Sequence, residues 1–206
     1  MSITRNLLVA ALLAAAGNAV AASSVDLSVK GTITPSACTL ALGNGGVVDF
    51  GKLSAKDLRP NLHTYLPSQD MQMSVTCEAA TLFAIAAKDN RGGSESSLDY
   101  HNFGLGLING SEKLGYHTLS LSGPMADDVY VRGIGSRDGG ATWEGDYSLM
   151  DDGLTSFARP GTLVPIPVQR LATNLQIGAA IAPSQGLTLT NEVPLDGAVT
   201  VTVVYL

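Results

Sequence analysis

The segment Ala198–Leu206 (AVTVTVVYL) alternates apolar and polar residues, which predicts a β-strand. In an extended chain the side chains of Val199, Val201, Val203 and Tyr205 point to one face, and that apolar face must be covered by other residues. The segment is therefore expected either to close a β-sandwich or to offer its edge to a strand from another molecule. Both arrangements require a fold made of sheets.

The first residues predict export. Arg5 gives a positive start, the run Leu7–Ala16 is apolar, and Ala19-Val20-Ala21 forms a small-x-small cleavage site. We interpret residues 1–22 as a signal peptide and place the protein in the periplasm and then at the cell surface. The apolar run is short for a bilayer span and no second run follows, so we expect no direct membrane insertion.

Composition narrows the function classes for residues 23–206, which are long enough for a single domain. The net charge is −6, and the loss of Arg5 makes the mature chain more acidic still. An acidic chain without a basic cluster repels phosphate backbones, which argues against nucleic-acid binding. Charged residues make up only 15% of the chain, and no helical periodicity stands out, which favours an all-β protein.

The chain has two cysteines, Cys38 and Cys77. In an exported protein, two cysteines are most simply explained by one disulfide. A loop of this length predicts a stabilisation of about 4 kcal/mol. A pair of metal-binding thiolates is the alternative, but neither a CxxC motif nor a nearby histidine supports it.

Strand patterns recur along the chain with turn residues between them. We expect Met71–Cys77 to be a strand with one buried face and Thr81–Lys88 to be a central core strand. The proline-containing run Thr162–Gln169 is expected to be an edge or bulged strand. Further strands are expected at 25–34, 102–108, 116–122, 128–134, 174–182 and 198–206. Eight to ten short strands with very little helix predict a β-sandwich with Greek-key connections.

Several motifs in combination resemble a known family. They are GTITPSAC at Gly31–Cys38, Val48-Asp49-Phe50-Gly51, an alternating strand that ends near Cys77, and a penultimate tyrosine. The chain in these respects resembles chaperone–usher pilus (fimbrial) subunits. Its middle, with KDNRGG, NFGLGLING and TWEGDYSL, is more similar to an uncharacterised family of fimbrial-like periplasmic proteins.

The resemblance implies an immunoglobulin-like sandwich that lacks its final strand. A periplasmic chaperone would fill the groove first, and neighbouring pilus subunits would replace it after passage through an outer-membrane usher. The expected groove strand, which would also contact the chaperone, comprises Val199, Val201, Val203, Tyr205 and Leu206. The expected donor-strand extension comprises Val25, Leu27, Val29 and Gly31. The implied function is assembly of a fimbrium used in cell adhesion, as a minor or tip subunit.

One departure leaves an alternative open. With the mature chain starting near Ala22 or Ser23, at most Ala22, Ser23 and Ser24 would precede Val25, which stands where donor extensions of this family carry a glycine. Residues 25–34 are thus either donated to a neighbour or packed as an ordinary first strand in cis. The second case describes a self-complemented binding module, periplasmic or secreted, with carbohydrate as a candidate ligand.

We expect no catalytic role. His63, His101 and His117 do not form a metal-spaced cluster or a known catalytic motif, and no cofactor motif is present. The loop with Trp143, Glu144 and Asp146 is typical of sugar-binding sites, because an aromatic ring can stack on a sugar while carboxylates accept its hydroxyl protons. The competing interpretation is that Trp143 packs against the end of the sandwich.

Overall fold

Alternating burial along β3 (Gln69–Thr81) shows how the sequence selects a sheet. Met71, Met73, Val75 and Cys77 are buried, while the residues between them are exposed or partly exposed. This period of two places one face of the strand on the core. The computed structural model describes residues 37–206, which lie in one compact unit.

The described residues form eight strands of five residues or more, several two-residue strands and three short 3₁₀ turns. In chain order these are β1 Cys38–Leu42, η1 Gly43–Gly46, η2 Ala55–Asp57, β2 Thr64–Tyr65, β3, β4 Phe83–Asp89, β5 Phe103–Gly104, β6 Leu107–Ile108, β7 Glu112–Lys113, β8 Gly115–Ala126, β9 Val129–Tyr130, β10 Arg132–Ser136, β11 Glu144–Gly145, β12 Leu154–Ala158, β13 Val168–Ile181, η3 Ser184–Gly186 and β14 Val199–Tyr205. No α-helix occurs among residues 37–206, and no helix there could span a membrane.

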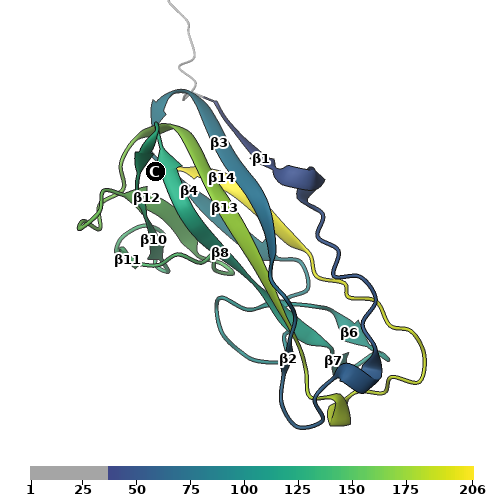
Figure 1. The fold of residues 1–206 in the computed structure, drawn as a ribbon. Coiled ribbons are helices and arrows are strands. Elements are labelled where there is room, and N and C mark those ends of the chain that lie inside the picture. The colour runs from purple at the N-terminus through teal and green to yellow at the C-terminus, as the bar shows by residue number, and fades with distance from the viewer. Residues whose placement is uncertain (1–36) are drawn as a thin grey trace, which may run out of the picture. The chain divides into compact units, whose positions relative to one another are not determined.

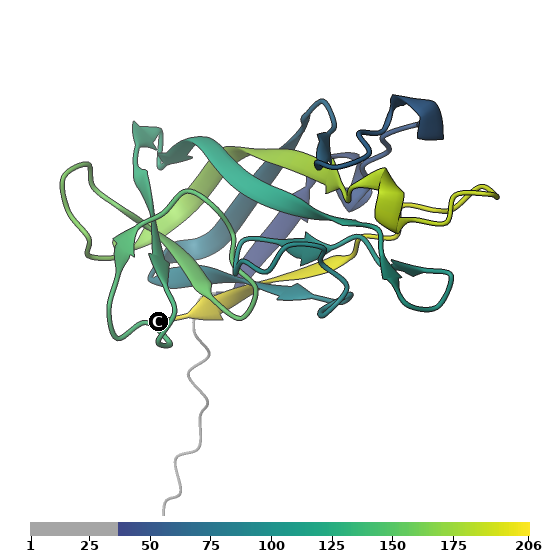
Figure 2. The same ribbon diagram turned by 90° about the horizontal axis from the view of Figure 1, so that it is seen from below.

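Two antiparallel sheets form the sandwich (Figures 1 and 2). The first sheet has the order β1-β3-β13-β8-β5, with β2 and β9 attached to it, and the second has the order β11-β10-β12-β4-β14. A separate hairpin pairs β6 with β7. The expectation of an all-β sandwich with very little helix is therefore confirmed.

Six of the strands follow the order of an immunoglobulin-type sandwich, while β12, β10 and β11 extend the second sheet beyond β4. In the constant-type fold, strands A, B, E and D share one sheet and C, F and G the other. Here β1-β3-β13-β8 reproduce the order A-B-E-D, and β4 and β14 occupy the positions of C and F. Within residues 37–206, no strand lies beside β14 at the position of G.

The main core lies between the two sheets and includes buried aromatic and aliphatic side chains such as Phe83, Phe103 and Phe157. A second cluster, around Leu105, Leu114 and Ile181, lies beneath the loops at one end. Val199, Val201 and Val203 pack against the main core but are only partly buried. The last strand therefore covers the core incompletely.

The strand expected at Thr162–Gln169 is present only from Val168 onward, where β13 begins. Pro165 and Pro167 cannot donate backbone hydrogen bonds, so the preceding residues remain irregular. Thr81–Lys88 agrees well with β4, which lies between β12 and β14 and is buried on both faces except at Lys88 and, in part, Ala86. The residues 1–22 and 25–34 discussed above lie outside the described range.

Candidate functional site

The outer edge of β14 is defined by its hydrogen bonds to β4. The carbonyl of Ala198 accepts a bond from the Asn90 amide, and the Leu206 amide donates to the Leu82 carbonyl. Residues of one parity in an antiparallel ladder direct both backbone groups to the same neighbour. The odd-numbered residues from Val199 to Tyr205 therefore direct their N–H and C=O groups away from β4.

The same reasoning applies to β1. The carbonyl of Ala37 accepts a hydrogen bond from the Glu78 amide, so residues of that parity pair with β3. Leu40 and Leu42 consequently direct their backbone groups away from β3. Among the described strands, β1 pairs only with β3 and β14 only with β4. Two incomplete sheet edges thus belong to neighbouring strands of opposite sheets.

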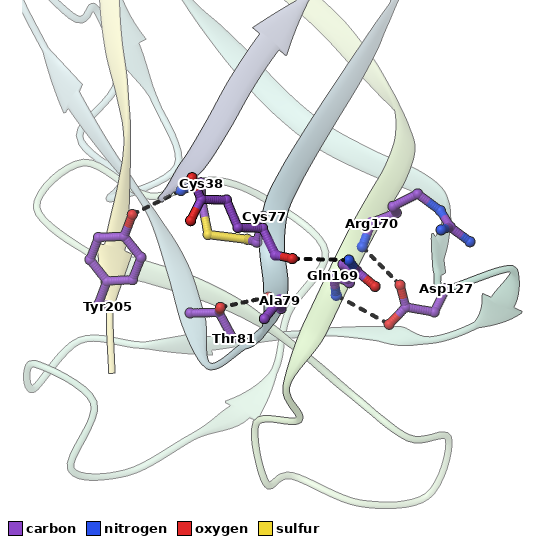
Figure 3. The surroundings of a disulfide bond; sticks show 9 residues. Cys38, Cys77, Ala79, Thr81, Asp127, Gln169, Arg170 and Tyr205 are labelled. Atoms are coloured by element: carbon purple, nitrogen blue, oxygen red, sulfur yellow. Dashed lines mark hydrogen bonds between the residues drawn. A yellow bond between two sulfur atoms is a disulfide. The ribbon is translucent and has the colours of Figure 1, made fainter. Parts of the chain in front are cut away.

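The two edges meet at one end (Figure 3). The Tyr205 hydroxyl accepts a hydrogen bond of 3.0 Å from the Cys38 amide. Cys38 is also joined to Cys77 on β3 by the expected disulfide, with the two Cα atoms 4.0 Å apart. The predicted disulfide between Cys38 and Cys77 is therefore confirmed, and it is consistent with an exported protein. It fixes the position of β1 where β1 approaches β14.

Away from this end, a hollow of about 340 Å³ separates the strands. Leu42 lines it from the β1 side, and Val199 and Val201 line it from β14. The inner face of the first sheet contributes Met71 and Leu119. We call the space bounded by these five residues the β1–β14 groove. Most of the residues that line it are apolar.

A second hollow of about 560 Å³ continues from the groove, sharing Val48, Phe50 and Leu195 with it. Residues 48–58 form one wall, and residues 189–195, which precede β14, form the other. The motif Val48-Asp49-Phe50-Gly51 therefore lies where the two hollows join. Phe50 also packs against both hydrophobic clusters.

His117 is the polar exception in the groove wall. It lies on β8, is 8% exposed and lines the first hollow beside Leu105 and Gly197. Burial lowers the pKa of its imidazole, although nearby Asp89 and the Phe103 backbone oppose this shift. Its Nδ1 atom has no hydrogen-bond partner within residues 37–206.

The loop before β14 is anchored next to the groove. Arg91 forms a bidentate ion pair with Asp196, with Nη2–Oδ1 and Nε–Oδ2 distances of 2.8 and 3.0 Å. This contact lowers the pKa of the Asp196 carboxyl. The Asp196 amide also donates to the Leu105 carbonyl. These bonds hold Gly197 against the His117 ring.

The loop around Trp143 has its own network of contacts. Trp143 is half-buried. Its Cζ2 atom and the Cδ2 atom of Leu206 both lie close to Gly140. Glu144 is exposed on β11. Asp146 is turned toward His101, whose Nε2 lies 2.8 Å from its Oδ2. The three residues expected to form a sugar-binding loop therefore have different surroundings.

Asp138 organises the same loop. It accepts hydrogen bonds from Thr142 Oγ1, the Thr142 amide and Ser136 Oγ. These bonds, led by that of the Thr142 hydroxyl, lower the pKa of Asp138 to about 2. The carboxylate thus stabilises a turn. Across residues 37–206, no group of three or more His, Cys, Asp or Glu side chains is arranged to hold a metal ion.

The expected donor positions Val25, Leu27, Val29 and Gly31 lie outside the described residues. Sequence reasoning missed β1 and the inward position of His117. Both had a signal in alternation: Leu40 and Leu42 alternate with polar or small residues, and His117 has the parity of Leu119 in the strand that contains both.

The sequence is similar to a described protein family and to two proteins of Escherichia coli K12. Residues 27–118 match the family described as "Protein of unknown function (DUF1120)". The chain is 30% identical to "Uncharacterized protein YhcF" of Escherichia coli K12 over 92% of its own length and 93% of that protein. It is 29% identical to "Protein GltF" of the same organism over 100% of its length and 98% of that protein. The chain therefore belongs to the DUF1120 family.

Proposed function

We propose that this protein is a non-enzymatic fimbrial subunit assembled by strand donation. The observation that carries the proposal is the β1–β14 groove, where two incomplete sheet edges flank an apolar hollow. Exposed sheet edges and apolar surface favour pairing with another chain. Addition of a strand from another chain (β-augmentation) would pair the open sheet edges and cover the apolar surface, because the incoming strand supplies both backbone hydrogen bonds and apolar side chains.

The expected partners follow from this proposal. A periplasmic chaperone donates the first strand, an outer-membrane usher directs the exchange, and the extension of a neighbouring subunit completes the fold in the fibre. Val25, Leu27 and Val29 supply that extension, and Gly31 ends it. The strand they form takes the position of strand G beside β14. The protein then contributes to the cell surface as a minor or tip subunit.

Fusion of a donor strand to the C-terminus tests this function. A short Gly/Ser linker and a second copy of residues 25–34 after Leu206 would form a hairpin with β14. We expect the fused mature chain to be a monodisperse monomer, with a melting temperature at least about 5 °C above that of the unfused chain, since about 2 kcal/mol shifts a domain of this size by that amount. Light scattering and thermal unfolding provide the readouts.

The matched control carries Leu27→Asp and Val29→Asp in the fused copy only. It keeps the linker and length but cannot insert two apolar side chains, so it should behave like the unfused chain. The proposal is contradicted if the unfused chain is already a monodisperse monomer with the same melting temperature as the fusion. That result would favour the self-complemented binding module.

A further inference from the structure

The β1–β14 groove is open along only part of its two edges. Val199 and Val201 line the hollow from β14, and Leu42 lines it from β1. Leu40 and Val203, the next residues of the same parity, pack against the main core without lining the hollow. In the described part of the chain, the open part of the groove therefore ends at Val201 on one side and at Leu42 on the other.

Tyr205 closes the end beyond these residues. Its hydroxyl accepts the 3.0 Å hydrogen bond from the Cys38 amide on β1 (Figure 3). Because this bond joins a side chain of β14 to the backbone of β1, the ring lies across the gap through which an inserted strand would pass. The disulfide to Cys77 holds Cys38 in this position. The groove therefore has room for a strand beside Val201 but not beside Tyr205.

The open edge continues in the other direction, past the start of β14. Leu195 and Gly197 line the same hollow. Within residues 37–206, neither of them forms a backbone–backbone hydrogen bond, whereas the amide of Asp196 between them donates to a carbonyl of the neighbouring loop. The alternation of paired and unpaired residues found in β14 is thus maintained. An inserted strand can pair with the whole stretch from Leu195 to Val201.

The expected N-terminal extension is short enough for this stretch. After the predicted cleavage, only Ser23 and Ser24, preceded at most by Ala22, would come before Val25. No further apolar residue would then be available to lie beside Tyr205. A short extension therefore corresponds to a groove that is closed at one end.

An antiparallel strand can match its apolar residues to the open stretch. The pairs in this register are Val25–Val201, Leu27–Val199 and Val29–Gly197. Residues opposite one another in an antiparallel pair share one face of the sheet, so the three apolar side chains of the extension point toward the hollow. The residue opposite Val203 is then Ser23, whose small side chain needs no hollow.

We propose that Tyr205 is a specificity-determining residue that limits the groove to a short strand, and that this strand is the extension of a second copy of the chain. The inference rests on the proposed function, because it concerns the strand that fills the groove. An extension with additional apolar residues at its start gains no further contact, because its extra residues meet the closed end. The groove thereby does not favour longer extensions over its own.

Peptides of two lengths test this limit. The first comprises residues 23–34, and the second carries Ser23→Val and an added Val-Thr at its start, which brings two more apolar side chains to the closed end. Binding is measured to the mature chain, to Tyr205→Ala and to Tyr130→Ala, a control at a tyrosine of similar exposure on β9. We expect the longer peptide to bind Tyr205→Ala at least about tenfold more tightly than the shorter one, and the other two proteins within about twofold.

A measurement on the unsubstituted chain covers the case in which Tyr205→Ala does not fold. With ¹³C-labelled tyrosine and valine, the ring signals of Tyr205 should stay unchanged when either peptide binds, while the methyl signals of Val201 should shift. A shift of the Tyr205 ring signals, a tenfold preference of the unsubstituted chain for the longer peptide, or equal binding of both peptides by Tyr205→Ala would overturn this inference and leave strand donation intact. Absence of binding by both peptides to all three proteins would overturn both.

Discussion

Replacing Val201 with aspartate is expected to abolish strand capture, whereas Thr202→Asp should leave it nearly unchanged. Val201 lines the groove and packs against the main core. An inserted strand would bury the new carboxylate without a partner, at a cost of about 3–5 kcal/mol. Each 1.4 kcal/mol is tenfold in affinity, so capture should weaken by at least about 100-fold.

Thr202 provides a matched control one residue away on the same strand. It is exposed and faces the opposite side of the sheet, and its backbone pairs with Ala86. Both variants are compared in the fused and unfused forms. The increase in melting temperature caused by fusion should disappear with Val201→Asp and persist with Thr202→Asp. An equal increase in both variants would contradict the placement of Val201 in the groove.

Loss of the disulfide is expected to have the second large effect. The bond between Cys38 and Cys77 closes a loop with a sequence separation of 39 residues. The chain-entropy estimate gives about 4 kcal/mol for such a loop. Since β1 is a five-residue edge strand paired only with β3, the disulfide also holds one wall of the groove in place.

The measurement is urea unfolding of the strand-fused protein and of its Cys38→Ser/Cys77→Ser variant. The free energy of unfolding should fall by about 4 kcal/mol. The strand-fused protein with both cysteines retained, unfolded in reductant, serves as the control and should match the double variant. An unchanged unfolding midpoint in both the variant and the reduced protein would show that the cross-link does not support β1.

Much of the fold could be predicted because the inward faces of long strands alternate strictly. Met71–Cys77 and Ala198–Leu206 gave such patterns, and both lie in sheets as expected. Thr162–Pro167 misled the prediction because apolar residues dominate while the prolines prevent pairing. The short β1 was missed because five residues next to a cysteine motif carry little periodic signal.

The groove could be predicted only through its β14 side. The facing wall depends on Leu42, Val48 and Phe50, which a turn at Gly43–Gly46 brings together. No local pattern encodes that arrangement, since it arises from pairing between β1 and β3. His117 falls in a predicted strand, but its burial next to Gly197, which is distant in sequence, could not be predicted from that strand alone.

Backbone amide exchange along β14 tests the central claim most directly. In the unfused mature chain, isolated as monomer, the amides of Thr200 and Thr202 bond to β4 and should exchange slowly, while those of Val201 and Val203 face the open edge and should exchange fast. In the strand-fused protein all four should be slow. Equal protection of all four amides in the unfused monomer would contradict the account, because the outer edge of β14 would then already be paired within the same molecule.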